Sequence, residues 1–427
     1  MIAQNTNKSK TRNRPGESSS RKSKRCRKLA KTRRRQARTA RMRRQQKARG
    51  LDDRALLRIS KSVFGKLLHH KQVLSIALVT LGVVYTARMT IHAIGAAMAK
   101  ARGNGSMKHG IKQVDRFMSN KKLIQVNMRK GLVTAVVGNR KKIDVSMDWT
   151  DFDKDDQTTL ALSLILKHGR AIPIVWLTVK KSTLKNRQTT YERTAVEMLN
   201  EALPENVLVT IIADRGFGNT LLFDHLLGIT GFNFIIRFRQ GFHLDADGYT
   251  GKAAGAVYRN GRIRVFAKAR LTGGKKGPYT VVLYKAAKMK DSWCMATNLE
   301  TTDGVDIIRK YGRRFECEEC FRDLKDWRFG LGLKHTKIKN GERRERLLFA
   351  FALAAYLLTL IGIESENLGC DRLLRANTST KRTHSLFRQG REIVAGALPV
   401  TLERDCLRAV ARVITVALKQ GFAYAMA

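Results

Sequence analysis

Apolar residues recur at helical spacing through the first third of the chain, but only after residue 50. From there to about residue 118 they are separated by three or four positions, as at Leu56, Ile59 and Val63. This periodicity places them on one face of a helix and predicts a helical region. Residues 1–50 show no such pattern, so nothing in them favours packing.

Two shorter helices are expected at the end of this region, at about 90–101 and 106–118. They are separated by a Gly-Asn-Gly-Ser turn, whose serine is a favoured helix N-cap. Lys108, Lys112 and Arg116 share one face of the second helix. A helix, a short glycine-containing turn and a basic helix are typical of a helix-turn-helix that binds DNA. An ordinary helical hairpin with a solvated charged face explains the pattern equally well.

From about residue 129 the pattern changes to short runs of apolar and β-branched residues, which are typical of strands. We expect five strands, at residues 143–149, 159–166, 172–179, 207–213 and 232–238. The helix between the third and fourth strands contains Glu192, Val196, Leu199 and Leu203. A second helix, at about 220–227, separates the fourth strand from the fifth. Three antiparallel strands followed by alternating helices and strands predict an α/β fold.

The rest of the chain is a glycine-rich β segment followed by helices. Residues 240–292 look like an insertion of short strands, and after a strand at 293–297 the chain is helical to its end. Residues 347–363 are apolar enough for a packed core helix. Residues 73–87 carry no charge, but they are fewer than the roughly 20 apolar residues that span a bilayer. We therefore expect a buried helix there and no membrane segment.

The charge balance points to an anionic partner. The chain has 83 Lys and Arg against 35 Asp and Glu, a net charge of +48. Residues 1–50 hold 20 of the basic residues and one acid, Glu17, so they carry 20 − 1 = +19 and the remainder 48 − 19 = +29. A nucleic acid is the expected partner, because each neutralised phosphate releases a counterion. The first 50 residues predict a disordered arm that coats phosphates, or else a solvated tail.

The cysteines and the N-terminus indicate a reducing compartment. Six cysteines in 427 residues do not make a disulfide framework. The first residues are polar and basic, without the apolar core of a secretory signal. We expect a cytoplasmic protein.

Two aspartates follow apolar strands of the predicted sheet. Asp148 ends the first strand and Asp214 ends the fourth. Ligands of α/β sheets gather outside the carboxyl ends of the strands, so these two carboxylates converge if the strands are neighbours. Hard oxygen ligands of this kind suit Mg²⁺ or Mn²⁺. Asp144 and Asp151 remain alternatives for the first ligand.

Residues 311–325 supply a third acid. Read as one helix, they place Tyr311, Arg314, Glu318 and Lys325 on a single face. That face would combine an acid for a metal ion with two cations for phosphate. Phe315 and Leu324 are then expected to face the sheet. A charged helix surface with pairs four residues apart is the plainer interpretation.

Two other patterns suggest metal sites and are judged weaker. Cys317 and Cys320 have the spacing of half a zinc site, but no second cysteine pair exists and they lie in a predicted helix. Asp245 and Asp247 hint at a calcium loop, yet alanine stands at position 256 where its glutamate would be. A hairpin turn is expected there instead.

The motif Tyr311-x2-Arg314-x3-Glu318-x6-Lys325 resembles the helix motif of the DDE transposases of the insertion-sequence-four family. The segments Asp148-Trp149-Thr150 and Asp214-Arg215-Gly216-Phe217 resemble the surroundings of that family's two catalytic aspartates. The resemblance covers roughly residues 70–365. It implies a ribonuclease-H-like core, a mixed sheet with flanking helices, interrupted by a β-rich insertion where residues 240–292 lie.

The resemblance also implies roles for individual residues. Asp148, Asp214 and Glu318 would bind two Mg²⁺ or Mn²⁺ ions, which act on the attacking and leaving oxygens of a phosphoryl transfer. Three residues, Tyr311, Arg314 and Lys325, would hold DNA phosphates near the cut end. Trp293 looks like the tryptophan that stacks on a flipped base. A core tryptophan is the alternative for Trp293.

These inferences give a domain organisation. After the arm at 1–50, we expect a helical domain that binds DNA ends at 51–128. The ribonuclease-H-like core occupies 129–239 and 293–365, on either side of the insertion at 240–292. A helical C-terminal region at 366–427 would mediate dimerisation.

The predicted function is cut-and-paste transposition in the bacterial cytoplasm, at the nucleoid. The partners would be double-stranded DNA, as terminal inverted repeats and as target, and a second copy of the chain. No membrane and no small-molecule substrate are expected. A metal-dependent nuclease on the same fold, such as a resolvase, is one alternative. A non-catalytic basic DNA-binding protein from a decayed element is another.

Overall fold

A computed structural model of the chain provides the three-dimensional description. It describes residues 29–33, 36, 52–86, 88–103, 106–123, 125–166, 170–258, 260–272, 274, 276–300, 303–325, 331–333 and 336–420. Of the predicted N-terminal arm, only 29–33 and 36 are described, as exposed helical residues. The rest of the arm lies outside the described residues.

The N-terminal region is helical, as predicted. It contains five described helices: α2 (Asp53–Phe64), α3 (His70–Val84), α4 (Ile91–Arg102), α5 (Met107–Ser119) and α6 (Gln125–Val137). The predicted cap is confirmed, because the side chain of Ser106 accepts a hydrogen bond from the backbone N–H of His109. The uncharged stretch forms α3, which is buried along most of its length. Helix α6 runs across residue 128, so the helical region extends to Val137.

Helices α4 and α5 approach each other at two glycines. A Cβ atom on Gly95 would lie 2.5 Å from the backbone of Ile111, and one on Gly110 would lie 2.2 Å from the carbonyl oxygen of Gly95. Only glycine permits this backbone contact. The close packing turns Lys108 and Lys112 outward, and both are exposed on α5 together with Arg116.

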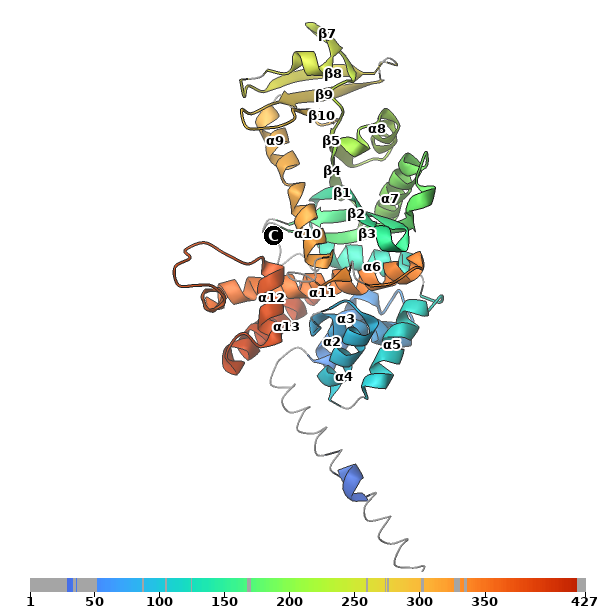
Figure 1. Ribbon diagram of the computed structural model, residues 1–427, viewed down its shortest axis with the longest axis vertical. Helices are drawn as coiled ribbons and strands as arrows, with labels where there is room; N and C mark the ends of the chain where they lie inside the picture. Colours follow the sequence, from blue (N-terminus) through green and yellow to red (C-terminus); the bar gives the residue numbers. More distant parts are fainter. Residues whose placement is uncertain are drawn as a thin grey trace, which may run out of the picture.

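A mixed sheet forms the centre of the molecule (Figure 1). Its first five strands are β1 (Lys142–Phe152), β2 (Gln157–Ile165), β3 (Ala171–Lys180), β4 (Leu208–Ala213) and β5 (Phe232–Arg237). The first three are antiparallel neighbours, and β1, β4 and β5 run parallel, in the order β3-β2-β1-β4-β5. Two helices, α7 (Gln188–Ala202) and α8 (Thr220–Leu227), connect the parallel strands. This arrangement is compatible with the predicted ribonuclease-H-like core.

Strand β1 is longer than predicted, and Asp148 lies inside it rather than at its end. The pairing of β1 with β4 stops at Met147 and Ala213, whereas its pairing with β2 continues to Phe152. The hairpin hydrogen bonds therefore hold the polar end of β1 in the sheet after its parallel neighbour has ended. As a result, the edge of β1 that faces the end of β4 is open at Asp148.

The segment between β5 and residue 293 is β-rich, as predicted, and it extends the main sheet. It forms β6 (His243–Ala246), β7 (Tyr249–Lys252), β8 (Arg264–Leu271) and β9 (Lys276–Tyr284). Strand β10 (Trp293–Thr297) pairs with both β5 and β9, which gives one ten-stranded sheet in the order β3-β2-β1-β4-β5-β10-β9-β8-β6-β7. The suspected calcium loop is the turn between β6 and β7, where Gly248 has φ +73°.

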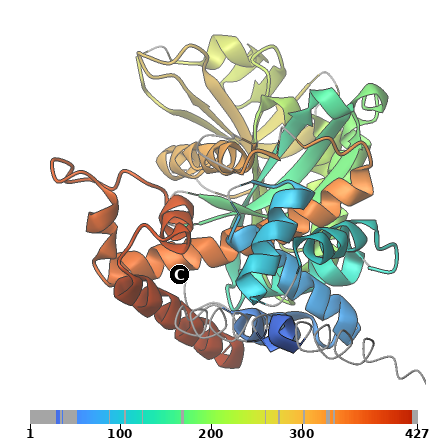
Figure 2. The ribbon, with the colours of Figure 1, turned by 60° about the horizontal axis from the view of Figure 1, so that its bottom comes forward.

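The C-terminal part is helical, with α9 (Gly304–Gly312), α10 (Phe315–Lys325), α11 (Gly341–Asn367), α12 (Leu386–Ala395) and α13 (Val400–Gln420). Helix α11 lies between the sheet and the N-terminal helices, as Figures 1 and 2 show. Among the described residues it is the one helix long and apolar enough to cross a membrane, and 83% of its most apolar window is buried inside the protein. This burial confirms the predicted core helix.

Candidate active site

Two of the predicted acids are brought together by the parallel pairing of β1 and β4. Met147 pairs with Ala213, so the next residue of each segment, Asp148 and Asp214, lies at the same level of the sheet. Asp214 comes directly after β4 and its Oδ1 accepts a hydrogen bond of 2.8 Å from the N–H of Gly216. This bond fixes the turn in which Asp214 stands, at the carboxyl end of the strand, as predicted.

The charge of Asp148 interacts with those of Asp214 and of Glu318 on α10. Burial, together with these two negative charges, raises the pKa of Asp148 to about 6, while the charge of Arg314 and a backbone hydrogen bond at Trp149 oppose the rise. Neither Asp148 nor Asp214 has an ion-pair partner within 4 Å in the described part of the chain. Of the three carboxylates, only that of Glu318 is paired with a cation there.

Arg314 is the cation closest to these acids. Its Nη2 lies 2.7 Å from Oε1 of Glu318, and its side chain is only 9% exposed. The guanidinium also lies over the ring of Phe315, 4.7 Å from the centroid. Tyr311 is buried beside it, and the charges of Tyr311 and Glu318 raise the pKa of Arg314 although burial, the largest influence, lowers it. Tyr311, Arg314 and Glu318 thus converge, as the motif predicted.

The prediction that residues 311–325 form one helix is wrong. Helix α9 ends at Gly312, and α10 begins at Phe315 after a tight turn. In this turn the N–H of Arg314 bonds to the carbonyl of Tyr311, and the N–H of Cys317 bonds to the carbonyl of Arg314. Glycine at 312 favours the interruption, because it is a poor helix former. Phe315, expected to face the sheet, is 46% exposed instead.

Lys325 is the last residue of α10, seven positions after Glu318. Its Nζ stands 5.3 Å from the centre of the Phe152 ring, at the far end of β1, and the guanidinium of Arg344 covers the same ring at 4.0 Å. Leu324, the neighbour of Lys325, is fully buried, as predicted. The structure therefore places three of the four motif residues together and the fourth further along α10.

Trp293 opens β10 beside the site. Its ring is partly buried and meets the ring of Tyr311 edge-on at 4.8 Å, with Phe315 at 6.5 Å and Tyr284 at 6.3 Å. The tryptophan is thus neither a fully buried core residue nor free of neighbours. It contributes to an aromatic surface next to Arg314.

The alternative acids are engaged in ion pairs. Asp144 lies 3.2 Å from Nη1 of Arg313. Asp151 lies 2.7 Å from Nζ of Lys181 in an exposed position. Glu316, also on α10, lies 3.5 Å from Arg313. These partners distinguish the three acids from Asp148.

The three acids offer the oxygen ligands that a hard divalent cation prefers, but among the described residues they are not close enough together to hold one. Oxygen ligands are those preferred by Mg²⁺ and Mn²⁺, and a cation would relieve the repulsion that raises the pKa of Asp148. Among the residues described, no three His, Cys, Asp or Glu side chains are close enough to hold a metal ion. The carboxylate of Glu318 is instead held by Arg314. Cys317 and Cys320 are both buried, and they too belong to no such group.

Glu192 is an acid beside the site that the sequence reasoning did not assign. It lies on α7, where burial raises its pKa and Asp214 contributes to the shift. The signal was visible in the sequence, because an acid stood in the apolar series with Val196 and Leu199. An acid at a core position of a helix is costly unless it has a role.

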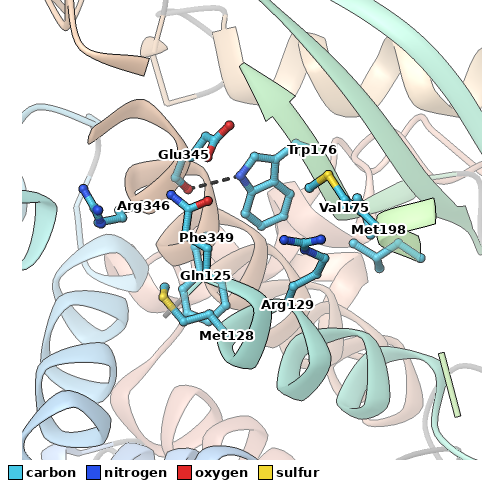
Figure 3. Close-up of a pocket in the computed structure, with 10 residues that line it drawn as sticks. Gln125, Met128, Arg129, Val175, Trp176, Met198, Glu345, Arg346 and Phe349 are labelled. Carbon is cyan, nitrogen blue, oxygen red and sulfur yellow. Dashed lines mark hydrogen bonds between the residues drawn. The ribbon is translucent and has the colours of Figure 1, made fainter. Parts of the chain in front are cut away.

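A separate pocket lies at the edge strand β3, away from the acids (Figure 3). Trp176 and Arg129 face it, and Nε1 of Trp176 donates a hydrogen bond of 3.2 Å to the carbonyl of Glu345. The carboxylate of Glu345 accepts from the N–H of Thr178 at 2.8 Å. Helix α11 thus satisfies polar groups of the sheet edge, which otherwise invite pairing with other chains.

Comparison with known protein families gives a match for part of the chain. Residues 184–357 match a family model described as the transposase DDE domain. The matched span contains Asp214 and Glu318 and begins after Asp148. A search of curated proteins finds no match. The family match supports a DDE transposase, a class of enzyme that acts on DNA and generally uses divalent metal ions.

Proposed function

We propose that the protein is a cut-and-paste DNA transposase of the insertion-sequence-four type, which cuts at terminal inverted repeats and joins the ends to target DNA. One observation carries the proposal. Asp148, Asp214 and Glu318 come from three distant segments and act on one another electrostatically, in a chain that matches a transposase DDE domain. An acid that remains half-buried without an ion-pair partner is more typical of a site than of a stabilising contact.

Asp148, Asp214 and Glu318 would hold two divalent ions. When bound, such ions activate the attacking water or 3′-hydroxyl and stabilise the leaving oxygen in an in-line displacement. The residues of this chain contribute the negative charge that attracts the ions. The N–H of Gly216 fixes the orientation of the Asp214 carboxylate in the turn after β4.

Arg314 controls whether Glu318 is available. Its guanidinium now pairs with the Glu318 carboxylate at 2.7 Å. A DNA phosphate offers the same guanidinium two oxygens in a bidentate geometry, which is among the strongest pairings of arginine. A DNA phosphate at Arg314 would compete with the Glu318 carboxylate for the guanidinium. Glu318, released from Arg314, would be free to join Asp148 and Asp214 in holding the divalent ions, so DNA binding and formation of the metal site would be coupled.

The remaining predicted contacts extend from this centre. Trp293 stacks on a base flipped out of the duplex, and Tyr311 packs behind it, 4.8 Å from ring to ring. Lys325, near the far end of β1, holds a phosphate further along the strand. The exposed face of α5 with Lys108, Lys112 and Arg116 binds the terminal repeats.

The proposed domains follow the sequence analysis, except that the helical domain predicted at 51–128 extends to Val137, the end of α6. This helical domain binds the DNA ends, and the core, predicted at 129–239 and 293–365 and beginning after α6, carries the chemistry. The arm at 1–50 coats phosphates, and residues 366–427 mediate dimerisation, so that two ends are held together.

The test uses a supercoiled plasmid that carries the inverted repeats flanking the gene. The full chain should nick it only when Mg²⁺ or Mn²⁺ is present, and should join the ends to a target duplex. Asp148→Asn, Asp214→Asn and Glu318→Gln should abolish cleavage and leave end binding intact. Glu319→Gln is the matched control, because this neighbour of Glu318 is paired with Arg170 and Arg322.

Three outcomes contradict the proposal. Full cleavage by the Glu318→Gln protein removes that residue from the site. Cleavage without joining identifies a nuclease on the same fold. Absence of nicking with either ion leaves a non-catalytic DNA-binding protein.

A further inference from the structure

Glu192 lies behind the strand that carries Asp148. Successive side chains of a strand point to opposite faces, so Trp149 points away from the face on which Asp148 meets α10. Nε1 of Trp149 donates a hydrogen bond of 3.3 Å to Oε1 of Glu192. Helices α7 and α10 accordingly lie on opposite sides of the sheet in Figure 1. Glu192 and Glu318 therefore approach the site from its two sides.

The surroundings of Glu192 connect both aspartate segments. Trp149 directly follows Asp148 in β1, and Asn219 lies shortly after Asp214. The side chains of Trp149, of Gln188 on the same helix as Glu192, and of Asn219 all favour the charged form of Glu192 and oppose the effect of burial on its pKa. Asn219 uses its Oδ1 to cap α8 through the N–H of Leu222, at 2.9 Å, which leaves its amide hydrogens for Glu192. One carboxylate thus contacts the two segments whose spacing determines the site.

The second oxygen of Glu192 has no partner. The residue is 1% exposed, and its Oε2 makes no hydrogen bond among the described residues. Neither an arginine nor a lysine pairs with it there, and Asp214, itself an acid, adds to the negative charge around it. Buried carboxylates that serve stability are paired with a cation or fully hydrogen-bonded. This one is instead left with an open acceptor next to the acidic site.

We propose that Glu192 is a positioning residue of the metal centre, a fourth acid that acts from behind the sheet. It ties the segments of Asp148 and Asp214 to each other, and it adds negative charge and a free acceptor on the side away from Glu318. Residues in this position around a metal centre orient the ligands and raise the affinity for the ion. The inference rests on the proposed function, because it requires Asp148 and Asp214 to bind the ion.

The test measures binding of Mn²⁺ to the full chain without DNA, by isothermal titration calorimetry. Glu192→Gln keeps the shape of the side chain and the acceptor for Trp149 but removes the charge. We expect Mn²⁺ to bind about 10- to 100-fold more weakly to this variant, the usual effect of removing an outer ligand-supporting group. Glu201→Gln is the matched control, because Glu201 is exposed on the same helix. It should bind Mn²⁺ like the unchanged protein.

A second measurement separates positioning from a structural role. The melting temperature in EDTA should stay the same or rise in Glu192→Gln, because a buried charge without a cation partner is removed. A lower melting temperature together with unchanged Mn²⁺ affinity would overturn the inference. If Glu192→Gln does not fold, Trp149→Phe tests the same link, because it keeps an aromatic ring and loses the hydrogen bond. Mn²⁺ affinity equal to that of the unchanged protein in Trp149→Phe would then overturn it.

Two further variants keep this inference separate from the proposed function. Asp148→Asn and Asp214→Asn should lose Mn²⁺ binding. If both retain it, the ion does not bind at the proposed centre and the proposed function fails. If both lose it while Glu192→Gln binds normally, only the role of Glu192 fails.

Discussion

Strand β1, the end of β4 and helix α10 carry two groups of acids that differ in how their charge is balanced. The first group, here called the paired acids, consists of Asp144, Glu316, Glu319 and Asp323. Each of them lies within 4 Å of an arginine, mainly Arg313 or Arg170. The second group, the open acids, consists of Asp148, Asp214 and Glu318. Among the described residues, only Glu318 in this group has such a partner.

The difference shows what marks a site among many acids. Burial does not mark it, because burial also raises the pKa of Glu316 and of Asp323 in the paired group. In that group arginines oppose the shift at close range. At Asp148, by contrast, two further acids add to the effect of burial, while the charge of Arg314 and a backbone hydrogen bond at Trp149 oppose it. Unbalanced charge, and not acidity or burial, separates Asp148 and Asp214 from the paired acids, whereas Glu318 is balanced by Arg314.

The largest expected difference is in DNA cleavage. Asp148→Asn should lower the rate about 10³-fold or more, because a lost metal ligand removes several kcal/mol of transition-state stabilisation. Asp144→Asn, four positions earlier on the same face of β1, should change it only a few-fold. Rates of plasmid nicking in Mg²⁺ measure both. Equal losses in the two variants would show that the open acids have no special role.

Ion binding should depend on pH through Asp148. Its pKa in the ion-free protein is about 6, and the charged form binds the ion. Mn²⁺ affinity should therefore be constant above pH 7 and fall about tenfold by pH 5. Calorimetric titrations across this range measure the effect. An affinity that does not change between pH 7.5 and 5 would contradict the raised pKa.

The free energy of unfolding should change in opposite directions in Asp148→Asn and Asp144→Asn. The pKa of Asp148 in the folded protein lies above its ordinary value of 3.8. Its contribution to the free energy of unfolding is therefore largest below pH 4, where it is protonated, and is lost as the pH rises to about 6. Asp148→Asn should thus stabilise the ion-free protein at pH 7.5 by on the order of 2–3 kcal/mol, and have no such effect near pH 4. Asp144→Asn should cost about 1 kcal/mol by breaking its pair with Arg313. Chemical denaturation in EDTA at both pH values measures these changes, and stabilisation by both variants would contradict the comparison.

The smallest effect concerns the two adjacent arginines. Arg314→Ala frees Glu318 and should tighten Mn²⁺ binding about two- to fivefold, the strength of one ion pair. Arg313→Ala removes a partner of the paired acids and should leave Mn²⁺ binding unchanged. If Arg313→Ala has the larger effect on Mn²⁺ affinity, the division between the two groups is wrong.

Elements with strong local signals could be predicted from the sequence. Helix α8 has the predicted bounds, because Asn219 caps it and its apolar residues recur at helical spacing. Strand β10 likewise has the predicted bounds. The single helix predicted at 311–325 was wrong. The motif residues keep a helix-like arrangement across the turn, so their spacing in the sequence does not reveal the break. In the turn, the N–H of Arg314 bonds to the carbonyl of Tyr311, and the N–H of Cys317 bonds to the carbonyl of Arg314. These bonds keep the motif side chains on either side of the break in similar positions.

The long-range partners of the acids could not be predicted. Arg314 bonds to Glu318, four positions away, as the plainer interpretation of this helix expected, but its neighbour Arg313 bonds to Asp144, 169 positions away. Only the packing of α10 against β1 brings Arg313 and Asp144 together. The same holds for Glu192, whose hydrogen bond to Trp149 joins residues 43 positions apart.

The pairing of β5 with β10 has a consequence for synthesis of the chain on the ribosome. Strand β5 ends at residue 237 and its outer neighbour begins at residue 293, so at 5–20 residues per second the edge stays uncovered for roughly three to eleven seconds. That edge belongs to the sequence Phe-Asn-Phe-Ile-Ile-Arg, which is apolar enough to pair with other chains. A truncated gene copy that stops between these strands would produce an aggregation-prone fragment. Chaperones would have to keep this fragment apart from intact copies of the protein.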